Sequence, residues 1–209
     1  MNSGAQEFKA KASGTRLGRV DLVYCNESYN SAATNERTVE VPLGHDFLDR
    51  FPAGTVVEVG AVMPYYGRQE HWVIDLYDSY SGCLREDAVG YDYTGLNVLS
   101  ISTVEHIGLP DYQMGSGQQL APMLAFRCLE KMIREANHYL VTFPIGHHKA
   151  LDQAVQASPY QRAILVRDGF NNWQAHPDPN DFNFAYGSPY PFGNAVCVLS
   201  DLEDYFAHA

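Results

Sequence analysis

Short apolar runs that end in polar or glycine-bearing turns recur between residues 55 and 108. The runs are TVVEVG (55–60), HWVIDLYD (71–78), a weaker CLREDAV (83–89) and LNVLSIST (96–103). Runs that are rich in β-branched residues and apolar on both faces are typical of strands in a parallel sheet covered on both sides. Because the carboxyl ends of parallel strands meet at one edge, we expect a ligand site where these runs end.

The second half of the chain continues this pattern. We predict strands at HYLVTFP (138–144), QRAILVRDG (161–169) and NAVCVLSD (194–201). We also predict a helix over residues 118–137, because its charged positions form one stripe and Cys128 and Met132 face the other way. Alternating strands and helices predict an α/β fold with a mainly parallel sheet. No helical pattern separates the last two strands, which predicts an antiparallel hairpin at one edge.

The N-terminal part reads as an arm and a helix. We predict two strands here, RVDLVYCNE (19–27) and ERTVEVP (36–42), separated by the turn-rich segment SYNSAATN (28–35). We also predict a helix at LGHDFLDRF (43–51), which ends before Pro52 and Gly54. Residues 1–15 are small and polar, and we expect them to be poorly ordered. We therefore predict one domain over residues 16–209, with the arm and helix at 16–54 and the core at 55–209.

Composition narrows the classes of function. The 209 residues carry a net charge of −11 and no Lys/Arg run, which argues against a nucleic-acid partner. The N-terminal residues lack the apolar core of a signal peptide and no stretch of roughly 18 apolar residues occurs, so we expect a cytoplasmic protein without a membrane partner. The four cysteines are scattered without a CxxC pair, which indicates neither a zinc site nor a disulfide framework. A homo-oligomer is left open.

Polar residues at the first strand ends suggest a nucleotide-type cofactor. Gly60 follows a buried strand, where glycine lets the backbone turn tightly beside a ligand, although an ordinary turn explains it equally well. Asp75 ends the next run, where a carboxylate can accept both hydroxyls of a ribose, and Asp78 is the competing candidate. Asp87, next to Ala88, can accept a hydrogen bond from an adenine amino group, or it can be an ordinary acidic residue at the surface. The full G-x-G-x-x-G pattern is absent, which disfavours a dinucleotide.

The fourth run ends in Ser102-Thr-Val-Glu105-His106, which places a carboxylate and an imidazole at the same edge. Histidine is the common general base near neutral pH, and Glu105 could orient His106 or join it on a divalent ion. The alternative is a capped helix start with an acid in its first turn.

A second histidine-bearing loop follows the fifth strand. His147, His148 and Asp152 have a ligand-like spacing, but no further ligand group is obvious, so we predict substrate-facing residues there and no metal site. The aromatic segment from Trp173 to Phe192 can wall a cleft or pack an irregular segment.

Four segments of the chain together resemble the class I S-adenosylmethionine-dependent methyltransferases: VVEVG, HWVIDLYD, REDAV and LNVLSISTVEHIG. The likeness is closest to a small bacterial-type subset found among sugar- and polysaccharide-modifying genes. NERTVEVP and YPFGNAV also resemble that subset, so the resemblance covers residues 35–200, and S-I-S-T-x-E-H-x-G is its most specific part. The chain departs from the family at Pro64-Tyr65-Tyr66, which occupies the place of the second glycine of the cofactor loop.

The resemblance implies a Rossmann-like seven-stranded sheet, mostly parallel with an antiparallel C-terminal strand, and helices on both faces. It implies that Glu58 and Gly60 lie near the methionine part of the cofactor. It also implies that Asp75 holds the ribose and Asp87 the adenine, with Ala88 and Ser102 completing the cofactor site. Glu105 and His106 would face the acceptor. Some related enzymes bind a divalent metal near such a pair, which we do not predict here.

We therefore expect a methyltransferase that transfers a methyl group from S-adenosylmethionine to a small polar acceptor, a sugar or related metabolite, with His106 taking the acceptor proton. The acceptor pocket is expected from Arg37, His147, His148 and Trp173. Two alternatives remain: a catalytically inactive binding or scaffold protein on the same fold, and a nucleotide-binding oxidoreductase.

Overall fold

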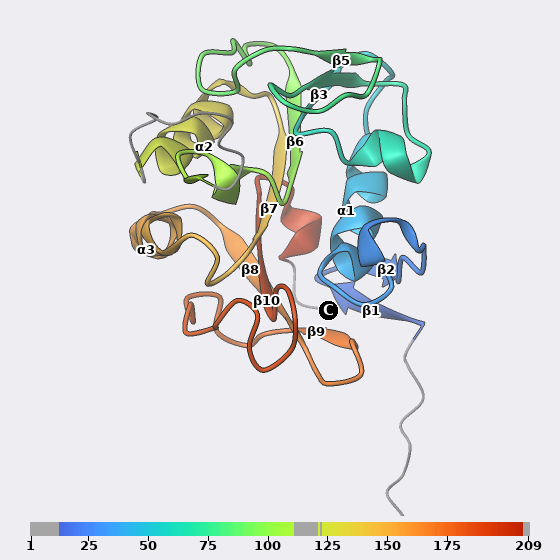
Figure 1. Cartoon of the computed structure of the whole chain (residues 1–209), viewed down its shortest axis with the longest axis vertical. Coiled ribbons are helices and arrows are strands. Elements are labelled where there is room, and N and C mark those ends of the chain that lie inside the picture. The colour runs from blue at the N-terminus through green and yellow to red at the C-terminus, as the bar shows by residue number, and fades with distance from the viewer. Residues whose placement is uncertain (1–12, 111–120, 122, 207–209) are drawn as a thin grey trace, which may run out of the picture.

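The computed structural model describes residues 13–110, 121 and 123–206 of the chain. Its centre is an eight-stranded sheet with the order β5-β4-β3-β6-β7-β10-β8-β9 (Figure 1). The strands are β3 (Val56–Val59), β4 (Trp72–Ile74), β5 (Cys83–Leu84), β6 (Asn97–Ile101), β7 (Tyr139–Pro144), β8 (Arg162–Arg167), β9 (Trp173–Ala175) and β10 (Ala195–Ser200).

Strand direction confirms the mainly parallel sheet. Neighbours from β5 to β7 all pair parallel, whereas β10 is antiparallel to both β7 and β8. The predicted antiparallel pair of late strands exists, but its predicted place at an edge is wrong, because β10 lies inside the sheet. The edge strand on this side of the sheet is β9, which pairs antiparallel with β8. It is an eighth strand, in a segment that was predicted as loop.

The chain changes direction of travel along the sheet at β3. From β3 it runs outward to β4 and β5, and then returns to the other side of β3 as β6. A crevice forms outside the carboxyl ends of strands at such a switch point, and ligands of α/β proteins bind there.

Helices cover both faces of the sheet, as predicted (Figure 1). On one face α1 (Arg37–Asp49) packs with a two-stranded hairpin, and on the other α2 (Met123–Glu135) and α3 (Lys149–Ala157) pack against a second apolar cluster. The regular alternation of strand and helix is only partly present. Between β3 and β4 the chain forms a short 3-10 helix, η2 (Met63–Tyr66), and no α-helix lies between β4 and β6. None of the described helices combines the length and apolar character needed to cross a bilayer.

The strand predicted at residues 36–42 is wrong, because α1 already begins at Arg37 and runs through Pro42. The β-like alternation of Val39 and Val41 with polar residues misleads because the polar Arg37, Thr38 and Glu40 are buried in this half of the helix as well. Pro42 has no N–H for the carbonyl of Thr38, and the backbone N–H of Cys25 donates to that carbonyl instead, at 3.0 Å. An outside donor therefore satisfies the bond that proline removes.

The N-terminal strand pair is a hairpin of β1 (Gly14–Leu17) and β2 (Val20–Val23). The predicted strand at 19–27 is thus confirmed in part, but its partner is β1 and not residues 36–42. Gly14 and Thr15, which fall in the tail expected to be poorly ordered, belong to β1, and residues 1–12 lie outside the described part of the chain. Helix α2 confirms the centre of the predicted helix, but the described residues 121, 136 and 137 are not helical, and residues 118–120 and 122 are not described.

Candidate functional site

A cavity of about 550 Å³ opens at the carboxyl ends of β3, β4, β5 and β6. This volume lies in the range of roughly 300–1,000 Å³ that small-molecule and cofactor sites occupy. Residues far apart in the chain meet there, as expected from the strand ends. The predicted site residues that line it are Arg37, Gly60, Asp75, Asp87, Ala88, Ser102 and His106.

Gly60 forms the tight turn after β3, with φ of +87°. A Cβ atom built at this position would lie only 2.0 Å from Oγ1 of Thr103. The turn therefore requires glycine twice, once for its left-handed backbone and once for its close approach to the end of β6. This contact brings the ends of β3 and β6 together at the cavity wall.

Glu58 does not line the cavity, contrary to the expectation that it lies at the cofactor. Its side chain is fully buried beneath the turn. Oε1 accepts from the backbone N–H groups of Val62 at 3.0 Å and Met63 at 2.8 Å, and Oε2 lies 2.7 Å from Nε2 of His71. Glu58 supports the turn from below. We did not predict His71, and the position just before a buried strand was the only signal for it.

Asp75 follows β4 directly and is half-buried at the cavity. Its Oδ1 accepts from the backbone N–H groups of Tyr77 at 2.7 Å and Asp78 at 3.0 Å, and its Oδ2 from that of Ala61 at 3.3 Å. These bonds fix the carboxylate at the strand end. Asp78 also lines the cavity, but its Oδ1 accepts from the phenol of Tyr65 at 2.7 Å, and this hydrogen bond raises the pKa of Tyr65 to about 12.

Asp87 and Ala88 also line the cavity. Asp87 is exposed and accepts at Oδ1 from the backbone N–H of Val89 at 3.0 Å, which holds a turn. Next to it the wall is apolar, formed by Ala88, Val89 and Ile107. An exposed acid beside an apolar slot can bind a flat ring that carries a donor at its edge.

Charge is distributed unevenly around the cavity. Among its described lining residues the acids are Asp75, Asp78, Glu86 and Asp87, whereas the only Arg or Lys is Arg37. An acidic wall attracts cations and disfavours phosphate groups.

Ser102 lines the cavity in a strained conformation, with φ of +38°. Its Oγ donates to Glu40, with the two carboxylate oxygens at 2.7 and 2.8 Å. Glu40 is fully buried and also accepts from Arg37 at 3.0 Å and Thr142 at 2.8 Å. Burial raises the pKa of Glu40 and the charge of Arg37 opposes that change. The hydroxyl of Ser102 therefore anchors α1 to the sheet, while Arg37 reaches the cavity from the same helix.

His106 lines the cavity, and Glu105 lies behind it. The Glu105 side chain is 2% exposed, and burial followed by the nearby charge of Glu40 raises its pKa well above the usual range. Oε1 lies 3.7 Å from Nε2 of His106, too far for a hydrogen bond. Oε2 is buried and has no hydrogen-bond partner among the residues that the structure describes. Burial therefore favours the neutral form of Glu105, and the 3.7 Å separation leaves His106 without a hydrogen bond from this carboxyl group.

The other predicted acceptor residues, His147, His148 and Trp173, do not line the cavity, and neither does Asp152 from the same loop. His147 contacts the cavity-lining His106 instead: the two rings pack edge-to-face with their centroids 4.7 Å apart. His148 is buried, and its Nδ1 accepts from the backbone N–H of Leu151 at 3.1 Å, so it caps α3. Asp152 accepts from Gly146 at 2.9 Å in the same loop. The described residues contain no group of three or more His, Cys, Asp or Glu that could hold a metal ion.

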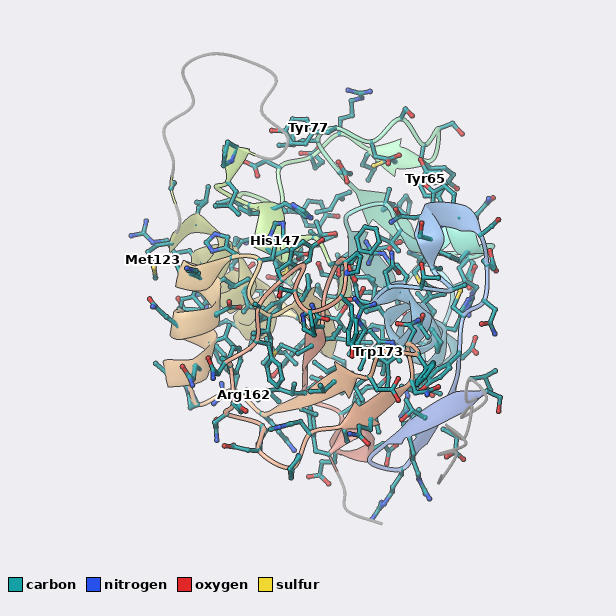
Figure 2. All side chains as sticks on the ribbon, turned by 60° about the horizontal axis from the view of Figure 1, so that its bottom comes forward. Tyr65, Tyr77, Met123, His147, Arg162 and Trp173 are labelled. Carbon is teal, nitrogen blue, oxygen red and sulfur yellow. The ribbon has the colours of Figure 1, made fainter. Side chains whose placement is uncertain are left out.

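Trp173 is a core residue of β9, and the prediction that it binds the acceptor is wrong. It is 3% exposed, its backbone N–H donates to the hydroxyl of Tyr24 at 2.6 Å, and its indole N–H donates to Asn171 at 3.1 Å. In the view of Figure 2 it lies on the far side of His147 from Tyr77, which lines the cavity. Its aromatic ring packs the fold, the alternative that the sequence left open.

A group of tyrosines at the cavity was missed. Tyr29 and Tyr66 line it, and Tyr29 stacks on Tyr65 with ring centroids 4.9 Å apart. Tyr29 and Asn30 belong to η1 (Tyr29–Ser31), within the segment that we described only as turn-rich. Asn30 has φ of 47°, so the backbone bends sharply over the cavity mouth. The available signal was the Tyr65-Tyr66 pair, which stands where the resembled methyltransferases have their second glycine.

No protein-family model matches this chain, and no curated protein does. The case for an activity therefore rests on the cavity and on the residues that line it.

Proposed function

We propose that the chain is an S-adenosylmethionine-dependent methyltransferase that O-methylates a small polar acceptor, a sugar or related metabolite. The observation that carries the proposal is one cavity that gathers Gly60, Asp75, Asp87 and His106 from four successive strand ends. The sheet gives further support: without the edge strand β9 it has seven strands, and the last in sequence is antiparallel to its neighbours.

The residues present fit this cofactor. The carboxylate of Asp75, fixed by backbone donors, suits the two hydroxyls of a ribose. The apolar wall with Asp87 at its edge suits an adenine ring and its amino group. The acidic lining suits a ligand with a positively charged sulfonium.

A dinucleotide fits less well, which argues against the oxidoreductase alternative. Dinucleotide folds bind the pyrophosphate at backbone N–H groups that follow the first strand. Here the N–H groups of Val62 and Met63 donate to Glu58, and the cavity adds four acidic side chains. A phosphate group would find these backbone N–H donors already bonded to Glu58, and the acidic side chains of the cavity would repel it.

S-adenosylmethionine, when bound, supplies an electrophilic methyl group. The chain would orient an acceptor hydroxyl against it and receive the proton that the hydroxyl loses. His106 is the described imidazole that lines the cavity, and it is the residue placed for that role. Glu105 is buried behind His106 and does not line the cavity, so it is not placed to receive that proton. Arg37, positioned by Glu40, presents a hydrogen-bond donor to a polar acceptor.

Transfer of a labelled methyl group from S-adenosylmethionine to a panel of hexoses, uronic acids and polar phenols tests the proposal. We expect transfer to at least one polar acceptor, and we expect His106→Ala to reduce turnover about 100-fold while the Kd for S-adenosylhomocysteine stays within about twofold. Binding of the cofactor without transfer to any acceptor would favour the scaffold alternative. Equal loss of turnover and binding in His106→Ala would remove the role of His106 as base.

A further inference from the structure

His71 and Glu58 form a buried pair directly beneath the turn that lines the cavity. The two side chains are 1% and 0% exposed, and His71 Nε2 lies 2.7 Å from Glu58 Oε2. The sheet places them together: Glu58 pairs in register with Val73, and His71 lies two residues before Val73 on the same face.

The hydrogen bonds assign the protons of the pair. Oε1 of Glu58 accepts from two backbone N–H groups, those of Val62 and Met63. A carboxylate oxygen accepts hydrogen bonds, so the remaining oxygen Oε2 needs a donor, and Nε2–H of His71 is placed to supply it. Three N–H donors then surround one buried carboxylate, as its burial requires.

Among the described residues the imidazole of His71 has no second hydrogen-bond partner. Its Nδ1 is buried without one in that part of the chain, which destabilises the fold relative to an apolar side chain of similar size. What histidine adds at this position is its bond to Glu58. The bond fixes the carboxylate, the carboxylate fixes the amides of Val62 and Met63, and these residues follow directly after the cavity-lining Gly60 and Ala61.

We propose that His71 is a positioning residue of the cofactor site: through Glu58 it holds the turn of residues 60–63 in the conformation that binds the cofactor. The inference rests on the proposed function for the identity of the ligand, S-adenosylmethionine. The positioning of the turn itself does not depend on that identity.

Two variants separate hydrogen bonding from packing. His71→Gln retains an N–H donor near the place of Nε2, whereas His71→Leu retains similar volume without a donor. His138→Leu is the matched control, because His138 also pairs with a carboxylate, Asp201, at 2.8 Å, but before β7 and away from the cavity. Thermal unfolding of the unliganded proteins shows first that all three remain folded at the assay temperature.

The primary readout needs no ligand. Hydrogen exchange at the amides of Val62 and Met63 should be at least about fivefold faster in His71→Leu, and close to wild type in His71→Gln and His138→Leu. The second readout is calorimetry with S-adenosylhomocysteine. We expect its Kd to rise at least about tenfold in His71→Leu, equivalent to about 1.4 kcal/mol, and to stay within about threefold in the two other variants.

Unchanged exchange in His71→Leu would overturn the proposal, and so would equal losses in His71→Leu and His71→Gln, because the N–H donor would then be irrelevant. A wild-type protein that does not bind S-adenosylhomocysteine would instead contradict the proposed function. In that case the exchange rates alone decide whether His71 positions the turn.

Discussion

Replacement of Gly60 by alanine gives the most quantitative test of the cavity's construction. The backbone at Gly60 has φ of +87°, and a left-handed conformation costs an L-residue roughly 1–2 kcal/mol. The new Cβ would also lie 2.0, 2.7 and 2.8 Å from the Oγ1, Cγ2 and Cβ atoms of Thr103. Relief of these contacts by movement of Thr103 costs about 1–3 kcal/mol more. We therefore expect Gly60→Ala to lower the free energy of unfolding by about 2–5 kcal/mol.

Gly95→Ala is the matched control. Gly95 has φ of +80°, a Cβ atom added to it would meet nothing within 4 Å, and it does not line the cavity. Urea denaturation should show a loss of only about 1–2 kcal/mol for this variant. In calorimetry Gly60→Ala should weaken S-adenosylhomocysteine binding, whereas Gly95→Ala should not. If the two alanines lower stability equally and both bind like wild type, the close contact between the turn and Thr103 is not as described.

Three other substitutions test the proposed contact of Asp75 with a ribose, the loop before α3 and the core. Asp75→Asn should weaken S-adenosylhomocysteine binding about tenfold or more in calorimetry, because a charge-assisted bond is lost, while Asp21→Asn on the exposed hairpin should not. Burial raises the pKa of Asp152 from 3.8 to about 6, so the folded state retains a proton that the unfolded state releases. Urea denaturation should therefore show stability falling by up to about 3 kcal/mol as the pH rises from roughly 3.8 to 6 in wild type, and much less in Asp152→Asn. Trp173→Phe should lower the free energy of unfolding by about 1–2 kcal/mol, as its indole hydrogen bond is lost, with no change in ligand affinity.

The parts of the fold that sequence reasoning predicted are those with a local cause. Buried strands such as β3 and β6 carry β-branched residues and end in turns, so their type and position follow from short windows of sequence. The meeting of Gly60, Asp75 and His106 followed from topology, because the ends of neighbouring parallel strands share one edge.

The parts that were missed depend on partners far along the chain. The first half of helix α1 was predicted as a strand because the polar Glu40 alternates with apolar residues. Glu40 is itself buried, with hydrogen bonds from Ser102 and Thr142, which lie 62 and 102 residues away in the sequence. Glu58 looked like a ligand-binding acid because its partner His71 could not be inferred before the register of β3 and β4 was known. Trp173 could have walled a cleft or packed the core, and the pairing of β9 with β8 decided for the core.

The central claim is that the cavity binds S-adenosylmethionine, and calorimetry of the wild-type protein with S-adenosylhomocysteine tests it most directly, with NAD as the comparison ligand. We predict one-to-one binding of S-adenosylhomocysteine, weakened by Asp75→Asn, and no binding of NAD. Absence of binding at about 1 mM S-adenosylhomocysteine, where even an affinity of about −4 kcal/mol would be detected, or preferential binding of NAD, would contradict it.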